Sequence, residues 1–107
     1  MNGQQLDGYV KNVLDTGDLA DKFRAFGWFT QSVNGHDIDE LYGAVQTALA
    51  HTGGPSMIVI RTRKGNGCPL AMDIEFSHHM KFTRDEKRRL IEDAEAALAA
   101  ARSAVNL

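Results

Sequence analysis

The sequence predicts an α/β fold in which a parallel βαβ unit precedes a C-terminal amphipathic helix. Three segments support this fold class: an extended stretch at 28–33, a helix beginning after Asp37, and a continuous apolar run at 57–60. Short connections join them, which is typical of a βαβ unit with its right-handed crossover. We therefore divide the chain into three parts: a loop segment at 1–17, a core at 18–82 and a helix at 83–107.

The core begins with a short helix. Asp18 has the side chain of a helix N-cap, and Gly27 is suited to end the helix. Apolar residues recur between them at helical spacing: Leu19, Phe23 and Phe26. The next stretch, Trp28 to Val33, is rich in aromatic and β-branched residues and runs into the turn pair Asn34-Gly35. It is predicted to be a strand.

A second helix and a second strand complete the βαβ unit. Asp37 with Glu40 three residues later predicts a capping box. The helix has one apolar stripe, formed by Ile38, Leu41, Tyr42, Val45 and Leu49, and is ended by Gly53-Gly54-Pro55. The run Met57-Ile58-Val59-Ile60 then has the pattern of a strand buried on both faces of a parallel sheet.

A further helix is predicted after Thr83, which with Glu86 has the spacing of a capping box. One side of it is apolar: Leu90, Ile91, Ala94, Ala97, Leu98 and Ala101. Two strands and three helices do not suffice to cover both faces of the run at 57–60, because two-stranded sheets are marginally stable. We expect additional sheet to come from outside these residues.

Composition limits the class of partner. The 107 residues carry a formal net charge of −2, with a pI near 6.0, which argues against nucleic acid as a partner. No apolar stretch approaches the roughly 20 residues of a membrane-spanning helix, so no membrane partner is expected. The single cysteine, Cys68, and the absence of a signal-peptide pattern at the start favour a cytoplasmic location.

Ligands of parallel sheets bind at the carboxyl ends of the strands, so the loops after both strands are candidate sites. One is Asn34-Gly35-His36, where we expect His36 to serve the turn rather than catalysis. The other spans Arg61 to Gly67 and contains three cations and two glycines. Glycines let backbone amides approach an anion, and Lys64 adds a point charge. A diphosphate or sugar phosphate is the functional interpretation, and a solvated turn is the alternative.

Three segments, in this order and spacing, resemble the later part of the diphosphate-binding domain of transketolases, which use thiamine diphosphate: Lys22 to Trp28, Asn34 to Asp39, and Thr62 to Gly67. The resemblance implies that residues 1–107 are a partial domain, the βαβ portion of a thiamine diphosphate-binding parallel sheet. The glycine-aspartate-glycine metal motif of the family and the histidines before it do not occur in this sequence.

The resemblance also implies site residues. Asn2-Gly3-Gln4-Gln5-Leu6-Asp7-Gly8 is similar to the family's metal segment, which makes Asn2, through its side chain, and Gln4, through its carbonyl, ligands of Mg²⁺. Oxygen donors are what Mg²⁺ requires. Leu6 would lie near the cofactor rings, with an ordinary core role as its alternative. Lys64 would contact the cofactor diphosphate.

His78 and His79 are adjacent, and the family has one histidine about fourteen residues after its lysine-glycine pair. Counting from Lys64 reaches His78, which the resemblance makes a catalytic and cofactor-binding residue. Ser77 and His79 replace the aromatic residue and glycine that usually flank it, so His79 stays open as an alternative, as does a solvated loop.

As mechanism, the resemblance implies transfer of a two-carbon ketol unit by thiamine diphosphate and Mg²⁺. This chain lacks the partner domain that activates the cofactor's pyrimidine, so we expect one piece of a split transketolase. Its partners would be an upstream piece of the diphosphate domain and a pyrimidine-binding subunit, with a sugar phosphate or related small molecule as substrate. Two alternatives remain: another thiamine diphosphate enzyme, such as a deoxyxylulose-phosphate synthase, and a non-catalytic scaffold.

Overall fold

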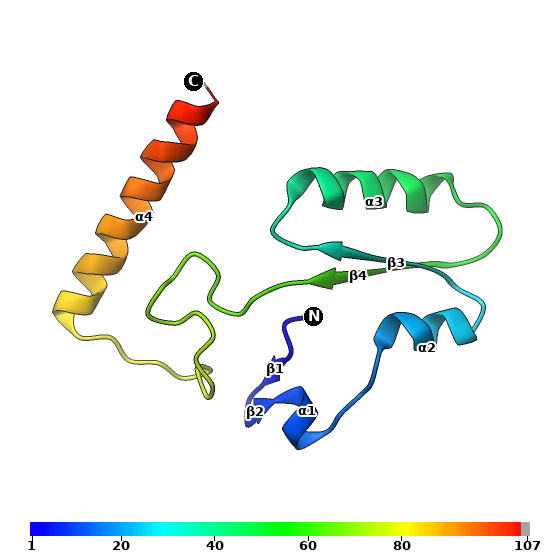
Figure 1. Cartoon of the computed structure of the whole chain (residues 1–107), viewed down its shortest axis with the longest axis horizontal. Coiled ribbons are helices and arrows are strands. Elements are labelled where there is room, and N and C mark those ends of the chain that lie inside the picture. Colours follow the sequence, from blue (N-terminus) through cyan, green and yellow to red (C-terminus); the bar gives the residue numbers. More distant parts are fainter. Residues whose placement is uncertain (106–107) are drawn as a thin grey trace. The chain divides into compact units, whose positions relative to one another are not determined.

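The structure is a computed structural model of the chain and describes residues 1–105. The last two residues of the helix predicted at 83–107 lie outside the described part. The chain forms two compact units, Met1–Arg63 and Lys64–Leu107, and each is described by itself below. Figure 1 shows the order of the elements along the chain.

The first unit contains the predicted βαβ arrangement. Strands β3 (Phe29–Asn34) and β4 (Ser56–Arg61) are parallel, and helix α3 (Ile38–Ala50) connects them. Their register begins with Phe29 opposite Ser56 and ends with Asn34 opposite Arg61. Because both strands run the same way, their carboxyl ends lie at one edge of the pair. The predicted α/β class, with both predicted strands, is confirmed.

Helix α2 (Leu19–Ala25) precedes β3 and begins as predicted, with the Asp18 carboxylate accepting a hydrogen bond from the Asp21 amide. The helix ends at Ala25 with Phe26 as its C-cap, and Gly27 follows with a φ of 80°, a left-handed conformation that favours glycine. Both α2 and α3 contact both strands. In Figure 1 they are drawn on either side of the strand pair.

The start of α3 differs in one respect from the predicted capping box. The Asp37 carboxylate accepts hydrogen bonds from the amides of Asp39 and Glu40, as an N-cap should. The Glu40 side chain, however, accepts from the Asn34 amide at 2.7 Å and so reaches back to the end of β3. The prediction of a reciprocal box was therefore wrong. Glu40 instead ties the helix start to the strand end.

The core of this unit is small. Among residues 1–105, the buried hydrophobic residues are Ala20, Ala44 and Val59. The predicted apolar stripe of α3 faces the strands only in part: Leu41 is half-buried, whereas Ile38 is 75% and Leu49 is 74% exposed. A pair of strands is too narrow to cover such a stripe, and Ala44 is the buried residue of α3. Within β4, Val59 is buried, whereas Ile60 is 40% exposed.

The segment 1–17 was predicted only as a loop, and the structure adds elements there. Strands β1 (Gln4–Gln5) and β2 (Gly8–Tyr9) form a short antiparallel hairpin. A single-turn helix, α1 (Val10–Val13), follows directly. Two-residue strands leave no periodic pattern to recognise in a sequence, which explains why they were not predicted.

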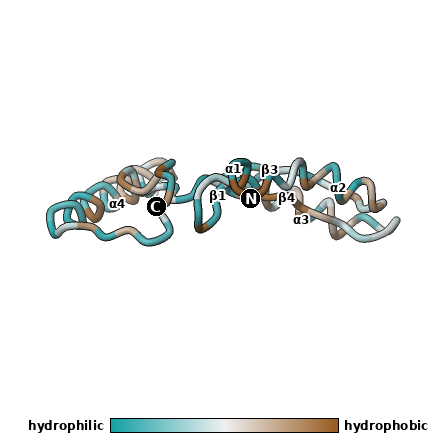
Figure 2. Tube along the Cα trace, turned by 90° about the horizontal axis from the view of Figure 1, so that it is seen from below, coloured by the Kyte–Doolittle hydropathy of each residue, from teal (hydrophilic) through white to brown (hydrophobic). Residues whose placement is uncertain are grey.

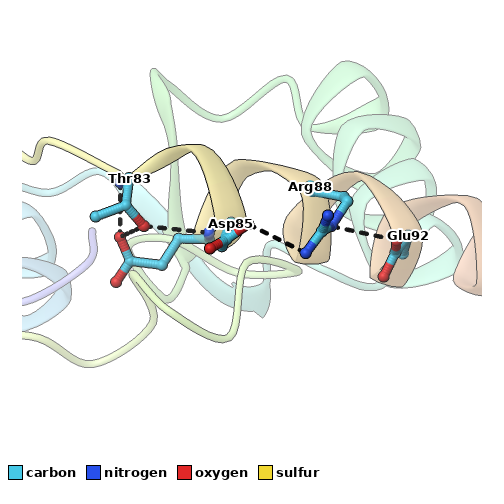
Figure 3. Close-up of polar contacts among 5 residues, drawn as sticks. Thr83, Asp85, Arg88 and Glu92 are labelled. Carbon is cyan, nitrogen blue, oxygen red and sulfur yellow. Dashed lines mark hydrogen bonds and ion pairs between the residues drawn. The ribbon is translucent and has the colours of Figure 1, made fainter.

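The second unit begins with turns and ends in α4 (Arg84–Ala104). The Thr83 hydroxyl accepts from the Glu86 amide while the Glu86 carboxylate accepts from the Thr83 amide, which confirms the predicted capping box (Figure 3). Arg88 lies between Asp85 and Glu92 on the next turns. Hydrophilic and hydrophobic residues alternate along α4 (Figure 2), and no residue of Arg84–Ala104 is buried.

Candidate functional site

The carboxyl end of the β3–β4 pair is where the first unit gathers its candidate residues. Gly35 directly follows β3 and donates its amide hydrogen to the Arg61 carbonyl at 2.6 Å. A Cβ atom at Gly35 would lie 2.5 Å from the methyl carbons of both Ile60 and Thr62. The turn after β3 can therefore run this close to β4 only because residue 35 has no side chain.

His36 continues this contact by one residue. Its Nε2 accepts a hydrogen bond from the Arg63 amide at 2.8 Å, and its own amide donates to the Asn34 side-chain oxygen at 3.0 Å. An accepting Nε2 leaves the ring hydrogen of a neutral imidazole on Nδ1. The turn role expected for His36 is thus present, but the bond to Arg63 was not predicted. The signal for it was topological, since loops that follow adjacent parallel strands meet at one edge.

The N-terminal segment lies on the other side of the β4 end. The Met1 carbonyl accepts from the Thr62 amide at 3.0 Å, and the Met1 nitrogen donates to the Ile60 carbonyl. Asn2 therefore lies beside the first residues of the basic loop 61–67. The sequence predicts a metal segment at 2–8 and a phosphate-binding loop at 61–67 separately. No local pattern in it indicates that one pairs with the other.

Asn2 and Gln4, the two predicted metal ligands, form a compact turn. The Asn2 side-chain oxygen accepts from the Gln4 amide at 2.9 Å, and Gln4 begins the β1–β2 hairpin. Asn2 is exposed and lines a pocket of about 610 Å³ together with Gln4 and Asp15. An amide oxygen has a second lone pair, so the side-chain oxygen of Asn2 and the backbone carbonyl of Gln4 fit a hard cation such as Mg²⁺. Two protein oxygens fill only part of an octahedron.

The other candidates have simpler surroundings. Leu6 is at the tip of the hairpin and is exposed. Lys64 is half-buried, and His78 and His79 are exposed, their rings perpendicular with centroids 4.7 Å apart. The candidates divide between the units: Asn2, Gln4 and Leu6 belong to the first, and Lys64 and His78 to the second.

Residues 1–105 contain no cluster of three or more histidine, cysteine, aspartate or glutamate side chains arranged for a metal ion. None of the helices in this part of the chain combines the length and apolar character needed to cross a membrane.

Comparison with known proteins identifies the family. The sequence profile described as "Transketolase, thiamine diphosphate binding domain" matches residues 1–95. The chain is 39% identical over 94 residues to the 6-deoxy-6-sulfo-D-fructose transketolase subunit SqwG of Clostridium sp. (strain MSTE9), covering 88% of this chain and 34% of that subunit. It is 34% identical over 89 residues to Transketolase 2 of Xanthobacter flavus, covering 82% of this chain and 13% of that enzyme.

The fold is also that of a solved relative. The crystal structure of transketolase from Campylobacter jejuni matches with a TM-score of 0.60 at 18% sequence identity, covering 95% of this chain and 20% of that one. The chain thus spans about a third of the SqwG subunit and a smaller share of full-length transketolases.

Proposed function

The chain belongs to the transketolase family of thiamine diphosphate-binding domains, and on this premise we propose that it holds the diphosphate and Mg²⁺ of the cofactor in a split transketolase-type enzyme. The reaction proposed is transfer of a two-carbon ketol unit. The substrate would be a sugar phosphate or a related small molecule. The proposed location is the cytoplasm.

One observation carries this proposal. The Met1 backbone pairs with Ile60 and Thr62, so the oxygen-bearing turn at Asn2–Gln4 lies at the same strand end as the start of the basic loop. A diphosphate bridged by Mg²⁺ requires oxygen ligands for the metal and positive charge for the phosphate oxygens close together. The carboxyl edge of a parallel sheet is where such ligands bind.

The proposed roles follow from the chemistry of the side chains. Asn2, through its amide oxygen, and Gln4, through its carbonyl, would hold the metal, and Lys64 would neutralise diphosphate charge. Leu6 would contact the cofactor rings. His78 would donate a hydrogen bond to the diphosphate or to the substrate, with His79 as its alternative. Thiamine diphosphate, when bound, supplies the electron sink for breaking and forming the carbon–carbon bond.

Partner polypeptides are part of the proposal. The donor set at Asn2 and Gln4 leaves metal positions to be filled by other groups, and α3 exposes Ile38 and Leu49 to a large extent. A large exposed apolar stripe on a helix is typical of a surface that packs against another element. The similar SqwG protein is by name a transketolase subunit. We expect an upstream piece of the diphosphate domain and a pyrimidine-binding subunit to complete the enzyme.

The test is the affinity of the isolated native assembly for thiamine diphosphate, measured by calorimetry with Mg²⁺. Asn2→Ala should weaken binding roughly tenfold or more, because it removes one of few protein oxygen ligands, and raising Mg²⁺ should recover part of the loss. Gln4→Ala should have a mild effect, because only the backbone carbonyl of Gln4 is used.

A matched control is available in the same pocket. The Asp15 carboxylate accepts from the Gly17 amide at 2.8 Å, a local hydrogen bond of the same kind as that of Asn2. Asp15→Ala should therefore leave cofactor affinity close to that of the wild type. Equal and negligible effects of Asn2→Ala and Gln4→Ala would remove the metal assignment. An equal loss in Asp15→Ala would attribute the effect of Asn2 to the shape of the segment.

A further inference from the structure

We propose that His36 is a positioning residue for the diphosphate-binding loop, and that it acts by fixing the backbone of Arg63 immediately before Lys64. The inference rests on the proposed function, since it concerns the loop that would hold the diphosphate. His36 itself contacts neither the reacting atoms nor the cofactor in this proposal. Its Nε2 acts only on the Arg63 amide, at 2.8 Å.

The hydrogen bonds beyond the last strand pair show why this contact is informative. The register of β3 and β4 ends at Asn34 and Arg61, and the Gly35 amide then donates to the Arg61 carbonyl. In a regular parallel pair, the next bond would run from the Arg63 amide to a backbone carbonyl of the neighbouring strand. Here the Arg63 amide donates to the imidazole of His36 instead. The side chain thus continues the ladder after β3 has turned away.

The other edge of β4 is also paired at this level. The Thr62 amide points to the opposite side and donates to the Met1 carbonyl. Successive residues of the strand extension are therefore held from alternate sides, Thr62 by the metal segment and Arg63 by His36. Loss of the His36 acceptor would remove the bond made by the Arg63 backbone amide, at the residue before Lys64.

The imidazole is itself held by its turn. The His36 backbone amide donates to the Asn34 side-chain oxygen, and the Asn34 backbone amide donates to the Glu40 carboxylate. The Asp37 carboxylate caps α3 by accepting two hydrogen bonds. These contacts fix the backbone on both sides of residue 36. A ring on such a turn can orient its partner at little additional entropic cost, which is the condition for preorganising a binding loop.

The experiment compares His36→Leu with His36→Gln in the isolated native assembly. Leucine cannot accept a hydrogen bond, whereas the glutamine side chain can bring a carbonyl oxygen to the region of Nε2. Hydrogen exchange of the peptide containing Arg63 reports the bond directly. Exchange at Arg63 should accelerate roughly tenfold or more in His36→Leu and be mostly restored in His36→Gln.

The same variants are then titrated with thiamine diphosphate and Mg²⁺ by calorimetry. His36→Leu should weaken the affinity roughly fivefold to tenfold, and His36→Gln should recover most of it. The apparent KM for the cofactor should rise by a similar factor while kcat at saturating cofactor is retained, because the residue positions the loop without touching the substrate.

His51→Leu is the matched control. His51 stacks on Phe29 with centroids 4.6 Å apart, at the opposite end of the strands. It should lower stability without changing exchange at Arg63 or cofactor affinity. The inference is overturned if His36→Leu leaves either quantity unchanged, or if His51→Leu reduces cofactor affinity equally. A wild-type assembly that does not bind thiamine diphosphate would contradict the proposed function itself. Binding retained equally by His36→Leu would contradict this inference alone.

Discussion

The hydrogen bonds within each of the two units join residues at different separations in the sequence. In the first, hydrogen bonds join residues far apart in sequence, such as Met1 with Thr62 and His36 with Arg63. In the second, the amides of Cys68 and Ala71 bond to carbonyls three residues earlier, and α4 is closed by a cap within four residues. Long-range bonds bring the start of the chain and the turn after β3 to the end of β4. Short-range bonds define a helix without providing a core for it.

The units also differ in what they bury. The first has Ala20, Ala44 and Val59 between its strands and helices, whereas no residue of α4 is buried. Both nevertheless expose large apolar side chains, including Tyr42 at 67% in the first. Exposed apolar side chains of this kind are the surface that the proposed partner polypeptides would cover.

The largest expected effect is obtained by removing every partner. Purified by itself, the chain should be marginally stable, oligomeric or prone to aggregate, and should show no micromolar binding of thiamine diphosphate. The reason is that its core is too small and its donor set is incomplete. Calorimetric melting and sedimentation measure the first property, and titration with cofactor and Mg²⁺ the second. If the chain alone is a monomer that melts cooperatively and binds the cofactor, the proposed need for partner polypeptides is wrong.

The next effect lies in the second unit. If His78 donates to the diphosphate or the substrate, His78→Ala in the assembly should lower kcat/KM roughly tenfold to a thousandfold, the range for one lost charge-stabilising contact. His79→Ala should be nearly silent and serves as the adjacent control. The reverse result would shift the assignment by one residue. If both variants were silent, the functional contribution would be confined to the first unit.

A third effect tests the close approach in the first unit. Gly35→Ala should destabilise the assembly by roughly 1–3 kcal/mol, because the new methyl group would overlap the side chains of Ile60 and Thr62 and the Arg61 carbonyl. Gly43→Ala in α3 is the matched control: a Cβ there meets nothing within 4 Å, and alanine favours the helix by roughly 0.5–1 kcal/mol. Urea unfolding measures both. Equal effects of the two variants would contradict the long-range account of this unit.

Local patterns predicted most elements of both units. The Asp18 and Thr83 caps and the apolar run that became β4 each act over a few residues, and the structure contains all of them. The partner of Glu40 was predicted wrongly because the capping-box spacing is the same whether the Glu40 carboxylate accepts from the N-cap residue or from the end of the preceding strand. The His36–Arg63 bond was not predicted because it joins residues 27 positions apart.

The candidate site residues stay predictions, and the sequence did not predict how they are brought together. Asn2 was proposed from the resemblance to the family's metal segment, and Lys64 from its basic, glycine-containing loop. That Met1 pairs with the end of β4, and so brings Asn2 beside residues 61–63, depends on which edge of the strand pair is open to a further segment. Such information is a property of the folded sheet and is not encoded in a local pattern.

The smallest expected effect concerns the cap of α4, which should persist in a synthetic peptide of residues 81–105 because its contacts are local. Hydrogen bonds from the Thr83 amide and hydroxyl lower the pKa of Glu86 below its ordinary value of 4.5. A depressed pKa adds helix stability above pH 4.5, and this contribution is lost as the pH falls through the lowered pKa.

Circular dichroism of the peptide at pH 7 and pH 3 tests this cap. The loss of helicity on acidification should be greater for the wild-type peptide than for Glu86→Gln, which keeps an acceptor but no charge, so the difference isolates Glu86 from the other carboxylates. Thr83→Ala should cost roughly 1 kcal/mol of helix stability at pH 7, the usual value of an N-cap. If Glu86→Gln and wild type lost helicity in parallel, the charged form of Glu86 would not stabilise the cap. If the peptide showed no effect of Thr83→Ala, α4 would depend on contacts from beyond its own turns, and the contrast between the two units would lose its basis.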